Sequence, residues 1–239
     1  MKQKLFIVIP AYQEERVITS VICELHTFGY RNIIVVDDGS TDGTYHRSQQ
    51  AAAIVLRHSM NRGKGAAVKT GIAAARMLDA DIIVTFDGDG QHDPKDIKNM
   101  LQYMHKGYDV ILGSRFLHKQ NIPTLKRIYN GIANSIAYVL YGIWVTDSQS
   151  GFRAYNRDAF SALDTESDRY EFDSEVLREI HMNKLKYKEI PIHVRYTRYS
   201  QKKDVKQGFL SGIKTAFQLV MKAREDYSYG YQHIYSQAI

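Results

Sequence analysis

Short apolar runs alternate with helical patterns along the first half of this chain. Such alternation is typical of a mostly parallel β-sheet flanked by helices, because parallel strands are joined by crossover connections that are usually helical. The runs that we interpret as strands are Leu5–Ile9, Asn32–Val36, Ala53–Arg57, Ile82–Phe86 and Asp109–Gly113. The segments with helical patterns are Glu15–Phe28, Gly43–Gln50, Lys64–Leu78 and Pro94–Lys106. The sequence therefore predicts an α/β fold.

The second half has a less regular pattern. A largely apolar helical block covers Leu125–Gly142, and Val205–Arg224 repeats apolar residues at the spacing of an amphipathic helix. We further interpret Gly151–Asn156 as an edge strand, Ser174–Asn183 as a helix and Tyr187–Tyr196 as extended chain. The prediction is one domain over residues 1–225, followed by a tyrosine-rich segment, 226–239, that we expect to be mobile.

The 239 residues carry a formal charge of +6 at pH 7, which favours anionic partners such as nucleotides or phospholipid surfaces. No RNP, zinc-finger or helix-turn-helix signature occurs, so nucleic acid is not an expected partner. The one cysteine, Cys23, excludes a disulfide framework and fits a reducing cytoplasm. Polar residues and glycines interrupt the uncharged stretch Ile128–Thr146, so we expect it to lie against a membrane surface or in the core, and not to span a bilayer.

The strongest local pattern is Asp87-Gly88-Asp89-Gly90-Gln91-His92, directly after the apolar run Ile82–Phe86. Open α/β sheets bind ligands beyond the carboxyl ends of their strands, so this position is typical of a binding site. Two carboxylates separated by one glycine can converge on a hard divalent cation. Such an ion would stabilise a diphosphate leaving group. We therefore predict a metal–diphosphate site here, with a solvated turn as the alternative.

Polar residues follow other predicted strands as well. Pro10-Ala11-Tyr12-Gln13-Glu14 follows the first strand and Val36-Asp37-Asp38-Gly39-Ser40 the second. An aromatic ring there can stack on a base, and a carboxylate can accept hydrogen bonds from base or ribose. The alternatives are favourable first-turn charges for Glu14 and Glu15 and an Asx turn for the aspartates. Arg62-Gly63-Lys64-Gly65 opens a predicted helix, whose N-terminal N–H groups and lysine favour an anion.

In this order, these segments resemble family 2 glycosyltransferases of the GT-A fold, and most closely the dolichyl- or polyprenyl-phosphate sugar synthases. Gly113-Ser114-Arg115 and the run from Asp147 to Arg153 add to a resemblance that spans residues 4–224. It implies a Rossmann-like, mostly parallel central sheet flanked by helices, with amphipathic helices at the C-terminal end. It also implies a nucleotide-sugar-binding half, residues 1–115, and an acceptor- and membrane-facing half, residues 116–225.

The resemblance assigns roles to individual residues. The base and ribose pocket would be lined by Pro10, Tyr12, Glu14, Val36 and Asp38. Mg²⁺ or Mn²⁺ and the donor diphosphate would be held by Asp87, Asp89 and Gln91, beside Lys64. The acceptor phosphate would meet Arg115 and Arg127, with Lys126 as a further cation. Arg198 would precede a closing loop that departs from the family's Gly-x-Ser-Lys pattern, with Lys203, or else Lys202, as its cation.

The implied reaction is an inverting transfer of a hexose or N-acetylhexosamine from a nucleotide-diphosphate sugar to polyprenyl or dolichyl phosphate. A phosphate oxygen is already ionised near neutral pH, so it needs positioning and charge screening instead of a general base. A glycan or cell-wall hydroxyl, the alternative acceptor, would need a base, and Asp147 is the candidate. A turn carboxylate is the other interpretation of Asp147. The residues predicted to act in catalysis are Asp89, Arg115, Arg127 and Asp147.

By analogy, Gly90 slightly favours a UDP-sugar over GDP-mannose. A non-catalytic nucleotide-binding protein is a further alternative. We expect the protein in the cytoplasm, bound peripherally to the cytoplasmic face of a membrane as a homodimer or with a membrane partner.

Overall fold

The computed structural model describes residues 3–118, 124–169 and 171–195. The predictions for Val205–Arg224, for the 226–239 segment and for Tyr196 lie outside these residues.

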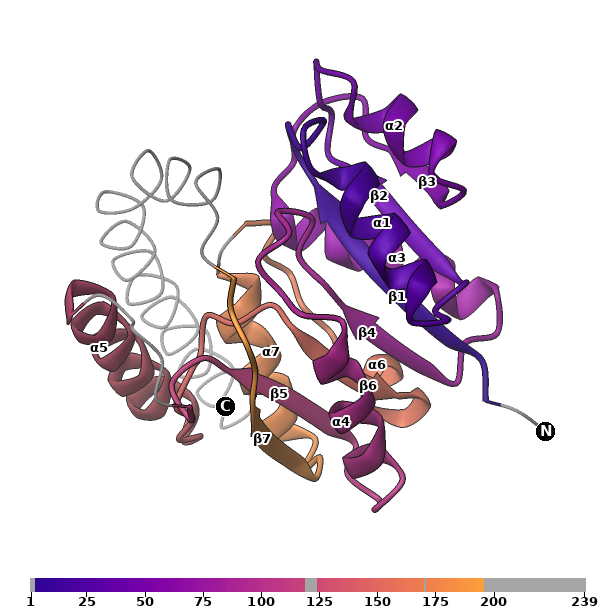
Figure 1. Ribbon diagram of the computed structural model, residues 1–239. Coiled ribbons are helices and arrows are strands. Elements are labelled where there is room, and N and C mark those ends of the chain that lie inside the picture. The colour runs from indigo at the N-terminus through magenta and orange to yellow at the C-terminus, as the bar shows by residue number, and fades with distance from the viewer. Residues whose placement is uncertain (1–2, 119–123, 170, 196–239) are drawn as a thin grey trace, which may run out of the picture.

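A seven-stranded sheet forms the centre of the domain (Figure 1). Its strands are β1 (Leu5–Ala11), β2 (Ile33–Asp37), β3 (Ile54–Arg57), β4 (Ile82–Thr85), β5 (Val110–Ser114), β6 (Arg153–Asn156) and β7 (Tyr187–Pro191). Their spatial order is β3-β2-β1-β4-β6-β5-β7. Every neighbouring pair is parallel except the two that include β6, which runs antiparallel to both β4 and β5. The predicted α/β fold with a mostly parallel sheet is confirmed.

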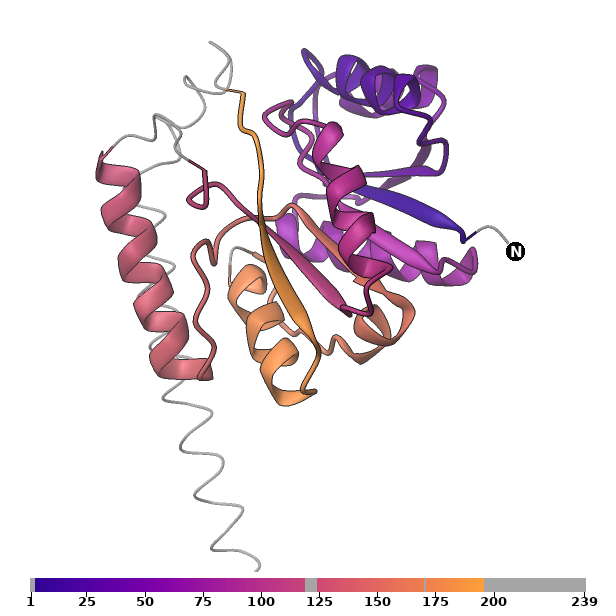
Figure 2. The same ribbon diagram turned by 60° about the horizontal axis from the view of Figure 1, so that its bottom comes forward.

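Helices cover both faces of this sheet (Figures 1 and 2). They are α1 (Ile18–Thr27), α2 (Thr44–Gln50), α3 (Lys64–Met77), α4 (Lys95–Met104), α5 (Thr124–Tyr141), α6 (Arg157–Ala162) and α7 (Phe172–Met182). The sheet has a hydrophobic core on each face, and successive residues of β1 point alternately into one core and the other, because side chains alternate along a strand. Phe6 and Val8 pack in the core with α3, α6 and α7, whereas Ile7 and Ile9 pack in the core with α1 and α4.

Strand β6 corrects one prediction from the sequence. Gly151–Asn156 was expected at the edge of the sheet, but β6 lies between β4 and β5 and is almost wholly buried. The charged residue at its start, Arg153, is only 2% exposed. Its guanidinium donates to the carbonyl oxygens of Ser148, Ser150 and Asp173 at 2.8–3.0 Å. Because its hydrogen bonds are largely satisfied, this arginine can occupy an interior strand.

The helix boundaries differ from the prediction in two places. Helix α1 begins at Ile18, three residues later than expected, and the carboxylate of Glu15, in the turn before it, accepts a hydrogen bond from the Gly43 N–H (2.9 Å). Helix α6 was not predicted. The side chain of Asn156 caps it by accepting from the Ala159 N–H at 2.8 Å.

Helix α5 stands apart from the sheet and contacts α7 (Figure 2). It corresponds to the apolar block predicted at Leu125–Gly142, and its outer side exposes Ile128, Ile132 and Val139. Within the described residues, no helix combines the length and apolar character needed to cross a bilayer.

The sheet order brings the candidate segments together. The chain runs from β1 outward through β2 to β3, and then returns to add β4 on the other side of β1. The carboxyl ends of β1 and β4 therefore lie next to each other where the strand order reverses, which is where open α/β sheets bind their ligands.

Candidate active site

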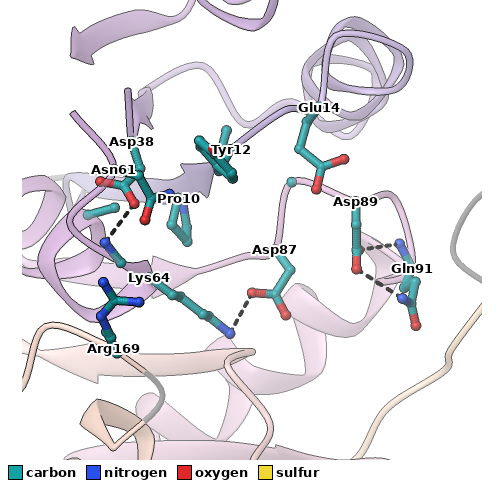
Figure 3. A pocket seen from close by; sticks show the side chains of 14 residues that line it. Pro10, Tyr12, Glu14, Asp38, Asn61, Lys64, Asp87, Asp89, Gln91 and Arg169 are labelled. Atoms are coloured by element: carbon teal, nitrogen blue, oxygen red, sulfur yellow. Dashed lines mark hydrogen bonds and ion pairs between the residues drawn. The ribbon is translucent and has the colours of Figure 1, made fainter. Parts of the chain in front are cut away.

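A pocket of about 350 Å³ opens at this reversal point, beyond the carboxyl ends of β1, β2 and β4 (Figure 3). Its volume lies within the range of sites for nucleotide-sized ligands. The residues that line it are Pro10, Ala11, Tyr12, Glu14, Asp38, Asn61, Gly63, Lys64, Ala67, Asp87, Gly88, Asp89, Gln91 and Arg169. Tyr12 is 42% exposed, so its ring face is accessible to a base.

Asp38 joins β2 to the loop before α3. Its carboxylate accepts hydrogen bonds from the N–H groups of Arg62 (2.9 Å) and Gly63 (2.8 Å) and from the ring of His58 (2.7 Å). Its neighbour Asp37 accepts from the Ser40 N–H, three residues on, at 3.0 Å. Asp38 therefore fixes one wall of the pocket, and its oxygens are already engaged by protein donors.

Lys64 and His92 hold the carboxylate of Asp87 from two sides. Lys64 Nζ lies 2.9 Å from Asp87 Oδ1 and 3.8 Å from the carboxylate of Asp173, and His92 Nε2 lies 2.9 Å from Asp87 Oδ2. Burial alone would raise the pKa of Asp87, but Lys64 and His92 outweigh it and hold that pKa well below its usual range. Burial would lower the pKa of Lys64, yet Asp87 and Asp173 raise it. Asp87 is therefore ionised and Lys64 charged at neutral pH.

The ring of His92 is itself fixed by packing. It lies 4.7 Å from the Phe152 ring and 5.5 Å from the Phe86 ring, centroid to centroid. Gly151, just before β6, has no side chain to displace the Lys64–Asp87 pair, since a Cβ there would lie 3.1 Å from Asp87 Oδ1. The loop before β6 thus contributes to the site through its closeness to β4.

Asp89 is oriented by Gln91. The carboxylate of Asp89 accepts from the Gln91 backbone N–H (3.0 Å) and from the Gln91 side-chain amide (2.9 Å). This contact leaves the carbonyl oxygen of the Gln91 side chain as the atom that could meet an ion.

These groups fit a hard divalent cation that is completed by its substrate. Among the described residues, no three His, Cys, Asp or Glu side chains come together in an arrangement that could hold a metal. Mg²⁺-type ions, however, are commonly bound by one or two carboxylates together with waters and substrate phosphates. Asp87 and Asp89, which both line the pocket, provide that donor set.

Arg115 and Asp147 form a bidentate pair at the end of β5. Asp147 accepts from Arg115 Nε (2.7 Å), from a terminal guanidinium nitrogen of Arg115 (2.7 Å) and from the Arg115 backbone N–H (3.0 Å). The side chain of Asp147 has no exposed surface, whereas that of Arg115 is 30% exposed. Asp147 therefore holds Arg115, and its contacts are not those of a turn carboxylate bonded to the N–H groups that follow it.

The residue before Asp147 is fixed by side chains from three other elements. Glu189 of β7 accepts from the Thr146 N–H (2.8 Å), and Ser114 Oγ lies 2.6 Å from Thr146 Oγ1. Two asparagines of α5, Asn130 and Asn134, donate to the Thr146 carbonyl oxygen at 2.6 and 2.8 Å. The position of the Arg115–Asp147 pair is thus linked to β5, β7 and α5.

The pocket gathers most of the site residues predicted in the first half of the chain. It is lined by Pro10, Tyr12, Glu14, Asp38, Lys64, Asp87, Asp89 and Gln91, as predicted. Val36, predicted to line the pocket, is not among the lining residues: its side chain is fully buried and lies against Gly71 of α3. At the start of α3 the Ala66 N–H donates to the Asp168 carbonyl oxygen, so this one N–H group is not open to an anion.

The predicted acceptor residues lie elsewhere. Arg115, Asp147 and the exposed Arg127 of α5 are not among the residues that line the pocket. Arg198 and Lys203 lie outside the described residues, as does the side chain of Lys126.

Six lining residues are not among the predicted site residues, and two of them, Asn61 and Arg169, carry polar side chains. Asn61 immediately precedes the Arg62–Gly65 segment, so its position gave a usable signal. Arg169 reaches the pocket through a contact with Gly63, far away in sequence, and no local pattern marks it.

An open, mostly parallel sheet with paired aspartates at its reversal point is the arrangement of the GT-A fold. The chain belongs to glycosyl transferase family 2, whose family model matches residues 6–164. The resemblance noted in the sequence is confirmed, and with it the enzyme class.

Relatives extend the match over nearly the whole chain. An uncharacterised protein of Methanocaldococcus jannaschii is 42% identical over 92% of this chain and 93% of its own. The UDP-N-acetylglucosamine–dolichyl-phosphate N-acetylglucosaminyltransferase of Methanococcus voltae is 36% identical over 91% of this chain and 95% of its own. Glucosyl-3-phosphoglycerate synthase of Mycobacterium tuberculosis, crystallised with Mn²⁺ and UDP, has a TM-score of 0.65 at 19% identity and covers 90% of this chain and 80% of its own, which shows the shared fold.

Proposed function

We propose that this enzyme transfers a hexose or N-acetylhexosamine from a nucleotide-diphosphate sugar to dolichyl or polyprenyl phosphate. The observation that carries the donor half is the pocket, in which Asp87 and Asp89 stand opposite the accessible ring of Tyr12 and the Asp38 wall. The name of the M. voltae relative supports the acceptor half and favours a UDP-sugar donor, with GDP-mannose as the alternative.

Asp87, Asp89 and the side-chain carbonyl of Gln91 would hold Mg²⁺ or Mn²⁺. The ion supplies positive charge that stabilises the departing diphosphate. The mycobacterial structure with Mn²⁺ and UDP supports this assignment. Lys64 and His92 keep Asp87 ionised and fixed, so the carboxylate is ready for a cation without rearrangement.

The Arg115–Asp147 pair favours a phosphate acceptor. A hydroxyl acceptor would need a base, and the candidate carboxylate of Asp147 is buried and already receives three hydrogen bonds from Arg115. A lipid phosphate is ionised without a base and needs a positioned cation. Arg115, oriented by Asp147, provides one, with Arg127 of α5 as a second. Inversion at the anomeric carbon follows if the phosphate oxygen attacks opposite the leaving diphosphate.

Such an acceptor lies in a membrane, so the enzyme would work at a membrane surface. We place it at the cytoplasmic face, where nucleotide sugars are available, as a peripheral protein. The exposed apolar residues of α5 and the net positive charge support this location.

The test is incubation of the purified protein with Mn²⁺, polyprenyl phosphate and one labelled donor at a time: UDP-N-acetylglucosamine, UDP-glucose or GDP-mannose. We expect an acid-labile, solvent-extractable labelled product from one donor. Unphosphorylated polyprenol is the matched control and should give no product. Label transferred to polyprenol or to a soluble glycan, with none on polyprenyl phosphate, would refute the proposed acceptor.

A further inference from the structure

Arg169 brings a guanidinium into the donor pocket from the second half of the chain. It lies just before α7, and Figure 3 shows its side chain on the same side of the pocket as Lys64, Asn61 and Asp38. Within the described residues, its side chain has no hydrogen-bond or ion-pair partner. A guanidinium carries five N–H donors in a planar fork, the geometry that suits a phosphate or carboxylate.

The backbone that carries Arg169 is held in place. The carbonyl oxygen of Asp168 accepts from the Ala66 N–H at the start of α3 (3.0 Å), and its carboxylate lies 2.6 Å from Lys69 Nζ. Glu175 of α7 accepts from the Ser167 N–H at 2.9 Å. An arginine on a fixed backbone loses less conformational entropy on binding than one on a free loop.

Glycines of the Arg62–Gly65 segment make this approach sterically feasible. Gly63 has φ +113°, and a Cβ there would overlap the Asp168 carbonyl oxygen and lie 2.8 Å from Arg169 Cγ. A Cβ on Gly65 would lie 3.0 Å from the Arg169 carbonyl oxygen. In this chain the two glycines, which lie at the start of α3, therefore leave the room that the loop carrying Arg169 occupies.

The other charged residues on this side of the pocket already have partners. Lys64 is paired with Asp87 and Asp173, and the carboxylate of Asp38 accepts three hydrogen bonds. A bound nucleoside diphosphate brings negative charge that Asp87 and Asp89 cannot compensate without a cation. Of the described cations that line the pocket, Arg169 is the one whose donors are uncommitted.

We propose that Arg169 is a donor-binding residue whose guanidinium contacts the diphosphate of the nucleotide. This inference rests on the proposed function, because it requires a nucleoside diphosphate in the pocket. The contact is made by a protein cation, so it operates alongside the divalent ion and does not depend on it.

The experiment is calorimetric titration of UDP and GDP into the wild-type protein and its Arg169→Ala variant, with Mn²⁺ and again in EDTA. For the better-binding nucleotide, loss of a charge-assisted contact should raise the Kd about tenfold in both buffers. Binding of the parent nucleoside, measured by NMR saturation transfer, should not change. Arg169→Lys keeps the charge without the planar fork, so its Kd should lie between those of the wild-type protein and Arg169→Ala. Arg76→Ala, on the last turn of α3, removes an equal charge away from the pocket and should match wild type.

Each result separates the possibilities. An unchanged Kd for the nucleoside diphosphate in Arg169→Ala, with an unchanged melting temperature, would overturn the inference while leaving the proposed function intact. Equal weakening of nucleoside and nucleoside diphosphate would also overturn it, because the contact would then be to base or ribose. If the wild-type protein binds neither UDP nor GDP, the proposed function fails and the inference fails with it.

Discussion

Asp147→Asn tests whether Asp147 works through Arg115 or acts as a base. The carboxylate takes three hydrogen bonds from Arg115, two of them at 2.7 Å from the guanidinium. The amide is isosteric but neutral and can accept at one atom only. Losing a charge-assisted hydrogen bond costs about 1.5–3 kcal/mol, which corresponds to a loss of about 10- to 100-fold in the fraction of correctly placed Arg115. We expect kcat/KM for polyprenyl phosphate to fall by that factor.

A double-mutant cycle makes the prediction specific. If Asp147 acts only by holding Arg115, then adding Asp147→Asn to Arg115→Ala should change the transfer rate by less than about twofold. The double variant should also melt at a higher temperature than Arg115→Ala alone, because that single change leaves a buried carboxylate without its partner. The assay is transfer of labelled sugar to extractable lipid, together with thermal melting.

The control for this cycle is Asp79→Asn, which breaks an aspartate–arginine pair with Arg157 that is half exposed or more on both sides. Exposed pairs contribute little, so this variant should melt and react like wild type. A further tenfold or greater loss when Asp147→Asn is added to Arg115→Ala would refute the positioning role, and would point to direct action of Asp147 on a hydroxyl acceptor.

Three other changes probe the pocket. Asp89→Asn should abolish transfer without lowering the melting temperature, and excess chelator should do the same to wild type; activity in either case would exclude the metal role. In EDTA, Lys64→Ala should melt at a lower temperature than wild type above about pH 4, and the difference should shrink in acid. The reason is that the pKa of Asp87 is lower in the folded state than its unfolded value of 3.8, so the Lys64–Asp87 pair stabilises the protein only where the carboxylate is ionised. A difference in melting temperature that is the same at every pH would contradict this. Gly63→Ala should melt lower and bind nucleotide more weakly than Gly107→Ala, since both glycines have positive φ but only Gly63 lacks room for a Cβ.

Local sequence patterns were sufficient to predict the parallel strands and the polar residues that follow them. β1, β2 and β4 are apolar runs followed at once by polar loops, so Tyr12, Asp38 and Asp87 could be assigned to one rim of the sheet without knowing its full order. Parallel connectivity alone places these ends together.

What could not be predicted depends on contacts between distant parts of the chain. The interior place of β6 depends on the three carbonyl oxygens that accept from Arg153, and the sequence does not reveal these partners. The side of β2 on which Val36 falls is set by the pleat relative to α3, which a uniformly apolar run does not reveal. The place of Arg169 in the pocket and the pairing of Arg115 with Asp147 both depend on contacts between loops more than thirty residues apart in sequence.

The reversed strand β6 has a consequence for how this enzyme can be divided. β5 pairs with β6 and β7 but not with β4. β4 and β5, the last two strands before residue 115, are therefore joined only through β6, which comes from the second half of the chain. A fragment ending at residue 115 would leave β4 with an open edge and β5 with no partner strand, a template for aggregation. Donor and acceptor functions therefore cannot be separated by truncation at that point.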